Sequence, residues 1–323
     1  MAVYNRIGGG GMNKVTLDGK PPKDRINLQL NFKYGRPISA HYKLNNGNTS
    51  SLDGYIYGKG YLKKTNEYFC ITGDYSANFS RFCTLKANQL DASTHWTARS
   101  LTEFNQTAAI DTIIRNDEVY ILTVDGKIYK LNSDYKTVTF INKIPTQFSC
   151  SYLQTSFNYI EKEDSAYIFQ SISSDKTPLK YDFKKNVFTT INTNVGFGDK
   201  RFTTVKDDKI YTLQGNSLLC FSEGVYTKIP INLSFEYGSR ISVFKDRLII
   251  FGGTEYKKTY NLYLGNENNT KFELIAILPV YCNQNTQTFM INNGRTILIL
   301  EALDVQRDLR CNYEISPSYE VIE

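Results

Sequence analysis

The sequence predicts an all-β fold, because a short sequence motif recurs six times. No segment shows the 3.6-residue periodicity and the capping residues of an α-helix. Each copy is a polar turn followed by a strand centred on an aromatic or aliphatic residue. These centres are spaced 51, 47, 44, 38 and 48 residues apart, and they are Phe69, Tyr120, Tyr167, Tyr211, Ile249 and Ile297. Four short antiparallel strands with their turns take about 40–50 residues, the length of one propeller blade. We therefore expect a six-bladed β-propeller. The alternative is a weak seventh blade assembled from 25–53 and the C-terminus, and in either case the first and last blades must pair or share strands to remove the exposed edge.

Patterns inside single repeats favour four strands per blade. In the second repeat, strands are expected at 110–114, 118–124, 127–131 and 138–143, and Asp125-Gly126 is typical of a hairpin turn. Three final strands end in proline, which stops the ladder before the chain crosses to the next blade. Those prolines are Pro145, Pro230 and Pro279. The expected limits of the blades are 54–100, 101–146, 147–195, 196–232, 233–281 and 282–323.

Residues 1–24 form a separate Gly/Pro-rich arm. Four consecutive glycines, Gly8, Gly9, Gly10 and Gly11, have no side chains to pack, and a breaker cluster follows at 19–24. Such an arm is expected to become ordered only against another surface. A phosphate-binding loop is disfavoured, because no Gly-Lys-Ser/Thr follows the glycines and no apolar strand precedes them.

Residues 25–53 are expected to form an amphipathic β-hairpin for attachment. Five apolar side chains alternate strictly with polar ones in its first strand, and they are Ile26, Leu28, Leu30, Phe32 and Tyr34. A turn at 35–37 lets 38–44 return as the partner strand. An isolated hairpin is marginal in water, so it must dock on the propeller or on another chain.

Three short motifs resemble a degenerate kelch-type propeller. Gly252-Gly253 ends a strand, Tyr181-Asp182 supplies the Tyr-Asp pair, and 226–230 (Tyr-Thr-Lys-Ile-Pro) stands in for the Trp-x-x-Leu-Pro ending. The chain departs from the kelch pattern in two ways: one repeat of six has Gly-Gly, and the blade tryptophan is generally absent. The resemblance covers 54–323 and implies architecture without activity, because propellers host many functions.

Composition excludes several function classes. The net charge of +6 comes from 38 basic and 32 acidic residues without a like-charge block, so no nucleic-acid partner is expected. No apolar h-region or run of 18 apolar residues occurs, which predicts cytoplasmic synthesis without a signal peptide or membrane span. The six cysteines are widely spaced and fit neither a zinc site nor a disulfide scaffold, so buried, inert thiols are expected.

Candidate catalytic groups are few, and the sequence predicts no catalytic residue, metal or cofactor. A histidine-based metal site or triad would have to use His41 or His95, which lie in unrelated contexts. Four aspartates recur at equivalent turns between first and second strands, and they are Asp117, Asp164, Asp208 and Asp246. Equivalence around the ring favours a turn-forming role over catalysis, because aspartate tolerates tight backbone geometry.

Binding is the function that the loops favour. The longer connections between second and third strands gather on one face of a propeller, and they carry Tyr75, Phe79, Tyr256 and Tyr260. These aromatic side chains could build an amphipathic contact patch. The alternative is that they pack on their own blades.

The chain as a whole resembles accessory tail or baseplate proteins of phages and phage-tail-like particles. The features that carry this resemblance are the Gly/Pro-rich arm, the amphipathic hairpin and a β domain without candidate catalytic residues. This resemblance implies a non-enzymatic structural component anchored through 1–44 to tail or baseplate proteins, and located in a virion or particle. Two alternatives stay open. One is a carbohydrate-binding propeller that recognises a cell-surface glycan or protein; the other is an intracellular kelch-type adaptor.

Overall fold

The computed structural model describes most of the repeat region and shorter stretches near both ends. It covers residues 2–6, 12–16, 31–38, 41–43, 49–51, 55–73, 80–87, 96–101, 108–146, 148, 150, 155–170, 178–192, 202–235, 239–253, 261–278, 280–281, 289–294, 296–304, 310–318 and 321–322. All regular elements in these residues except one short 3-10 turn are β-strands. The predicted all-β class is thus confirmed for the part described.

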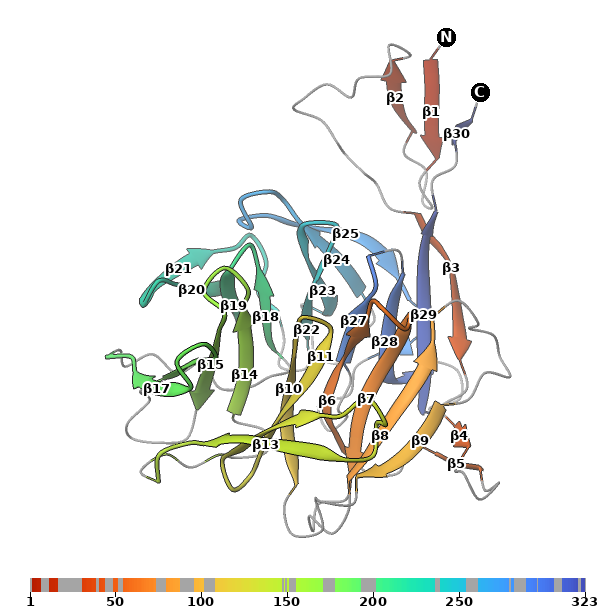
Figure 1. Cartoon of the computed structure of the whole chain (residues 1–323). Helices are drawn as coiled ribbons and strands as arrows, with labels where there is room; N and C mark the ends of the chain where they lie inside the picture. Colours follow the sequence, from red (N-terminus) through yellow and green to blue (C-terminus); the bar gives the residue numbers. More distant parts are fainter. Residues whose placement is uncertain are drawn as a thin grey trace.

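Four sheets follow the expected plan, in which consecutive antiparallel strands make one blade (Figure 1). The first contains β10 (Ala109–Arg115), β11 (Glu118–Thr123), β12 (Lys127–Leu131) and β13 (Val138–Lys143). The second contains β14 (Thr155–Ile160), β15 (Ser165–Gln170), β16 (Leu179–Asp182) and β17 (Val187–Thr190). The third contains β18 (Thr203–Lys206), β19 (Lys209–Gln214), β20 (Ser217–Ser222) and β21 (Val225–Pro230). The fourth contains β22 (Arg240–Phe244), β23 (Arg247–Gly252), β24 (Asn261–Gly265) and β25 (Phe272–Ile277).

Two larger sheets complete the ring. One has the order β5-β4-β9-β8-β7-β6, made of β4 (His41–Lys43), β5 (Thr49–Ser51), β6 (Tyr55–Leu62), β7 (Glu67–Gly73), β8 (Ser80–Lys86) and β9 (Trp96–Leu101). The other contains β26 (Val280–Tyr281), β27 (Phe289–Asn292), β28 (Ile297–Asp304), β29 (Arg310–Ser318) and β3 (Asn31–Ile38). Neighbouring sheets touch through their innermost strands, in the order β6, β10, β14, β18, β22, β27 and back to β6. This closed circuit is the geometry of a propeller.

The ring closes through β3, which corrects the predicted hairpin. β3 pairs antiparallel with β29, with Gly35 opposite Ile315 and Arg36 opposite Glu314, and it does not pair with β4. β4 instead joins β9 in parallel and pairs with β5. The predicted propeller class is therefore confirmed, but the predicted limits of 54–323 are too narrow, because the two closing sheets also contain β3, β4 and β5. Pairing the two distant segments covers an edge that would otherwise stay open.

A third type of sheet lies outside the ring and joins both ends of the chain. β1 (Ala2–Arg6) pairs antiparallel with β2 (Met12–Thr16) and with β30 (Val321–Ile322). Figure 1 shows this small sheet projecting beyond the ring, with the N- and C-termini side by side. The predicted arm thus contains two strands that pair with each other.

The recurrent motif supplies buried core residues to each sheet of the ring. Its six central residues lie in β7, β11, β15, β19, β23 and β28, and each is at most 5% exposed. Hydrophobic clusters join neighbouring sheets, and one of them unites Trp96 and Leu85 with Phe289 and Leu298 across the closing seam. Burial of these rings and aliphatic chains between sheets supplies most of the driving force for the fold.

Candidate functional site

Most sequence-predicted binding residues lie outside the described part of the chain. This holds for Gly8, Gly9, Gly10, Gly11, Ile26, Leu28, Leu30, Tyr75, Phe79, Tyr256 and Tyr260. Phe32 and Tyr34 belong to β3, where the backbone pairs with β29. The structure therefore places two of the anchoring candidates in the ring closure, and the loop-aromatic patch stays a prediction.

The recurrent turn aspartates adopt the left-handed backbone that the turn prediction requires. Their φ angles are 62° at Asp117, 48° at Asp164, 55° at Asp208 and 58° at Asp246. Aspartate is among the residues that tolerate this region, and such φ values suit the tight turns between hairpin strands. The turn-forming prediction is confirmed at all four positions.

Three of these carboxylates also tie neighbouring sheets together, which the sequence did not predict. Asp117 accepts hydrogen bonds from the backbone N–H groups of Lys63 (2.7 Å) and Lys64 (2.9 Å), in the equivalent turn of the preceding sheet. Asp208 accepts one from the N–H of Lys162 (3.2 Å) in the same way. We call these contacts turn latches.

Asp164 forms the strongest latch, because its partner is charged. Arg115 donates from Nε to Oδ1 (2.5 Å) and from Nη2 to Oδ2 (2.9 Å), and its guanidinium lies 4.8 Å from the Phe183 ring centroid. The Tyr159 hydroxyl donates to the same carboxylate (2.9 Å). Hydrogen bonding from Arg115 lowers the pKa of Asp164 to about 2, whereas burial raises the pKa of Tyr159 to about 12.

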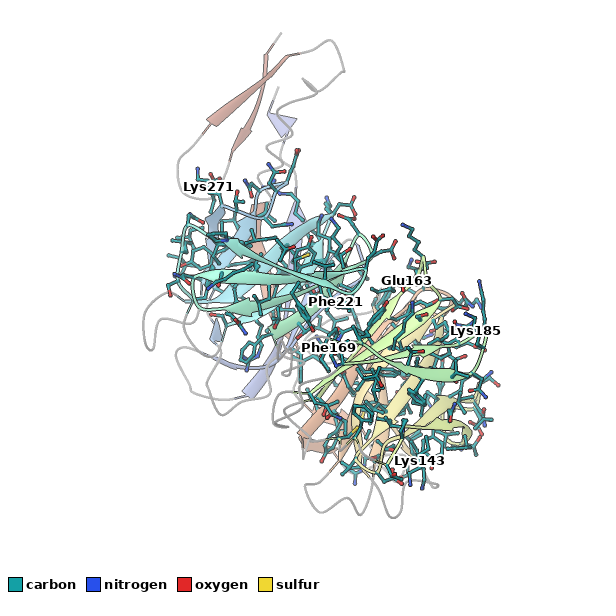
Figure 2. All side chains as sticks on the ribbon, turned by 90° about the vertical axis from the view of Figure 1, so that its left-hand side faces the viewer. Lys143, Glu163, Phe169, Lys185, Phe221 and Lys271 are labelled. Carbon is teal, nitrogen blue, oxygen red and sulfur yellow. The ribbon has the colours of Figure 1, made fainter. Side chains whose placement is uncertain are left out.

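A groove of about 640 Å³ lies where the sheet of β14–β17 meets the sheet of β18–β21. Its walls come from the turn at 161–164, from Lys180 in β16, and from the turns at 207–208 and 223–224. Figure 2 shows Glu163 beside this junction, with Phe169 and Phe221 at the seam between the sheets. The centroids of these two rings are 5.3 Å apart, in an edge-to-face arrangement. Tyr167, which lines the groove, meets Phe221 edge-to-face at 5.3 Å, so the aromatic seam adjoins the groove.

Charged side chains dominate the groove, and ion pairs hold several of them. Three lysines face four carboxylates, and these residues are Lys162, Lys180, Lys209, Glu163, Asp207, Asp208 and Glu223. Lys180 pairs with Glu163, and the Tyr167 hydroxyl donates to the same carboxylate at 2.6 Å. Burial opposes ionisation of Glu163, but Lys180 and Tyr167 outweigh it and keep its pKa below the usual range. Such a surface suits a polar ligand.

Four described carboxyl groups have shifted pKa values, and none of them belongs to a metal-binding cluster. Among the residues that the structure describes, no group of three or more histidine, cysteine, aspartate or glutamate residues could hold a metal ion. The pKa values of Asp134, Glu163, Asp164 and Asp182 lie below their usual range. A general acid at neutral pH needs the opposite shift. No helix in the described part of the chain is long and apolar enough to cross a membrane.

Sequence reasoning missed the groove, although part of its signal was visible. The turn residues Glu163 and Asp208 belong to the recurrent motif, and for Asp208 the equivalence around the ring with Asp164 was predicted. Lys180 lies in β16, which is not part of the recurrent motif. It reaches Glu163 only through the register of β15 with β16. That register depends on the three-dimensional pairing of strands.

The described geometry defines the class of the protein as an all-β propeller. Comparison with known proteins agrees: no family model and no curated protein sequence matches the chain, whereas 715 solved chains do. The solved structure of YjhT aligns with 89% of this chain and 98% of its own, with a TM-score of 0.55 and 12% sequence identity. This likeness shows the fold alone, because propellers of the same architecture serve unrelated functions.

Proposed function

We propose that this chain is a non-enzymatic attachment propeller, anchored to a larger protein assembly through the sheet of β1, β2 and β30. The observation that carries the proposal is the meeting of both chain ends in one small sheet outside the ring (Figure 1). The ring is closed by β3, so this sheet is not needed to complete a blade.

The small sheet is suited to strand addition. β2 and β30 are its two edge strands, and β30 spans two residues. Edge strands present unpaired backbone N–H and C=O groups that a partner strand can satisfy. A three-stranded sheet with such short elements gains much of its stability when it docks on another surface.

The assembly that we propose is a phage tail or a phage-tail-like particle, in which tail or baseplate proteins are the partners. The support is the combination of a Gly/Pro-rich N-terminal arm with a kelch-like repeat region. In this role the ring is a rigid spacer whose outward faces contact the next component or a cell surface.

Deletion of residues 1–24 tests the proposal, because it removes β1 and β2 and leaves β3 in place. The deletion variant should keep a cooperative thermal transition but no longer co-sediment with a megadalton particle. The full chain with Lys162→Ala, a substitution of an exposed groove residue, serves as the control and should co-sediment normally. Normal incorporation of the deletion variant would contradict the anchoring role of residues 1–24. Elution of the full chain as a free protein would contradict the proposal that it is a component of a particle.

Carbohydrate binding is the second candidate, and the polar groove supports it. Lysine and carboxylate side chains beside Tyr167 and Ile191 can hydrogen-bond several sugar hydroxyls. A glycan array probed with the chain that lacks residues 1–24 should give reproducible hits, which Lys180→Met abolishes if the groove is the site. An array without hits, or hits unchanged by the substitution, would exclude the groove as a glycan site.

A further inference from the structure

Two buried cysteines lie directly opposite each other in β7 and β8, which are neighbouring strands of one closing sheet (Figure 1). Cys70 is the antiparallel partner of Cys83, and the register runs through both strands without a bulge. Both residues are 0% exposed. Opposed residues of an antiparallel pair have Cα atoms about 4.5 or 5.5 Å apart, and both separations lie within the range of about 4.4–6.8 Å that a disulfide spans. The backbone therefore places these two cysteines at cross-linking distance.

The two side chains point to the same face of this sheet. Cys70 and Cys83 pack in the cluster that contains Trp96, at the seam with the last sheet. The residues that precede them, Phe69 and Phe82, belong to the cluster on the opposite face. Successive side chains of a strand alternate between faces, so the two thiols meet on one side of the strand pair. Their sulfur atoms can therefore join without a change of register.

The two thiols interact, and their surroundings favour the thiolate of Cys83. The hydrogen bond with Cys70 is the largest contribution that lowers the pKa of Cys83, whereas burial acts in the opposite direction. The Thr72 hydroxyl, 3.7 Å from the Cys83 Sγ atom, lowers this pKa further, as do the positive charges of Arg81 and Arg99. The thiolate is the nucleophilic form of cysteine. Cys83 thus has the character of an attacking thiol, and Cys70 lies where a resolving thiol is needed.

Other cysteines in the described strands have different surroundings. Cys220 lies between Tyr211 and Thr227 in its sheet, and burial raises its pKa. That combination is typical of an inert thiol. In the strands that the structure describes, no two cysteines other than Cys70 and Cys83 are opposed. The predicted inert role therefore suits Cys220 and does not describe the opposed pair.

We propose that Cys70 and Cys83 are an oxidisable dithiol, which hydrogen peroxide converts into a disulfide within the closing sheet. The Cys83 thiolate attacks one peroxide oxygen, the O–O bond breaks, and the leaving hydroxide takes up a proton to form water. The Cys70 sulfur then attacks the sulfenic acid of Cys83, and its proton leaves with the hydroxyl group as a second water while the S–S bond forms. Two thiols and one peroxide thus give one disulfide and two waters.

The location of the pair determines how the reagent enters and what the disulfide does. Hydrogen peroxide is small and uncharged, so local opening of the sheet is enough to admit it. The disulfide ties β7 to β8 beside the seam between the first and last sheets, and a reducing thiol releases it by exchange. This modification is independent of the attachment role.

The competing explanation is that the two thiols only fill the core. Peptide mapping by mass spectrometry, after treatment of the folded chain with hydrogen peroxide and alkylation of the remaining thiols, separates the two. The wild type should give the 70–83 disulfide as its main link, and dithiothreitol should remove it. Cys70→Ala should instead accumulate a sulfenic acid at Cys83 that dimedone labels, whereas Cys83→Ala should leave Cys70 unlabelled. Cys220→Ala replaces another buried cysteine and is the matched control, which should keep the link.

Measurements on the wild type decide the matter if either variant of the pair fails to fold. Trp96 is the only tryptophan of the chain and lies in the same cluster, so its fluorescence should change at the rate at which the link forms. The urea-unfolded chain should give a mixture of links among its six cysteines. Three outcomes would overturn the proposal: no 70–83 link in the folded chain, the same mixture of links in the folded and unfolded chains, or a link that forms without a change in fluorescence. Equal dimedone labelling of the two single variants would contradict the assignment of Cys83 as the attacking thiol.

Discussion

The sheets of β10–β25 and the two sheets at the closure are built by different rules. In the first region, each sheet consists of four consecutive strands joined by short connections. In the second, β3 and β29 come from opposite ends of the chain, and β4 joins β9 in parallel. Local repetition therefore specifies the blades, while contacts between distant segments close the ring. Closure carries a larger entropic penalty, because long loops must be fixed before such strands can pair.

The comparison predicts its largest effect when β3 is removed. Deletion of residues 1–38 takes away β1, β2 and β3, and it leaves β29 as an unpaired edge. We expect loss of the single cooperative transition, or aggregation, because the last sheet loses its outer strand and only the packing of β27 against β6 still joins the first and last sheets. Deletion of residues 1–24 alone should change the midpoint by a few degrees at most. Differential scanning calorimetry of the two variants measures the contrast, and equal midpoints would show that β3 does not close the ring.

A smaller but still large effect is expected where β6 and β10 pack closely. A Cβ at Gly58 would lie 2.3 Å from Thr112 Cγ2 and 2.6 Å from Thr112 Oγ1. Gly58→Ala should therefore destabilise the fold by up to about 3 kcal/mol through overpacking. Adding Thr112→Ala should recover part of the loss in urea denaturation. A Gly58→Ala chain as stable as the wild type would mean that the inner strands are farther apart.

The ion-paired latch between the second and third repeats should contribute about 2 kcal/mol, since Arg115 lowers the pKa of Asp164 from 3.8 to about 2. Both side chains are at most 20% exposed. Because the folded pKa lies below the unfolded one, the contribution is complete above pH about 4–5 and is lost as pH falls towards 2.

Asp164→Asn keeps a residue that tolerates the left-handed turn and removes the charge. Urea unfolding at pH 7 should show the loss, and the difference from the wild type should vanish near pH 2. Glu161→Gln in the same turn, an exposed carboxylate, is the control and should shift stability by less than about 0.5 kcal/mol. A difference that is the same at both pH values would refute the charge-based explanation.

The smallest effects are expected at the uncharged latches. Asp117 accepts two backbone hydrogen bonds, and Asp208 accepts one that is longer. Glycine retains the positive φ, so Asp117→Gly and Asp208→Gly remove only the carboxylate contacts. We expect losses of about 1 kcal/mol and about 0.5 kcal/mol, respectively. Thermal unfolding of both variants measures the two losses of stability. A larger loss in Asp208→Gly than in Asp117→Gly would mean that the carboxylate hydrogen bonds do not determine them.

The repeat region was predictable because its information is local. The central residues Phe69 and Ile297 alternate with polar turns in every repeat, and the four regular sheets fall within the predicted limits. β3 was predicted as a strand from its alternation, but its expected hairpin partner was 38–44, whereas it pairs with β29. A strand with one apolar face specifies burial, and several partners can provide it.

The candidate site was predictable only in part. Turn geometry at Asp164 follows from residue type and position, whereas its pairing with Arg115 requires two sheets to meet.

The most direct test of the closure is a disulfide between β3 and β29. Arg36 lies opposite Glu314 in the antiparallel register, so cysteines introduced at both positions should cross-link in the folded chain. Cysteines at 36 and 313 are the control, because a shift of one residue points the side chains to opposite faces. Peptide mapping by mass spectrometry should find the 36–314 link in high yield and the 36–313 link rarely. Equal yields, or no link in either variant, would contradict a ring closed by these two strands.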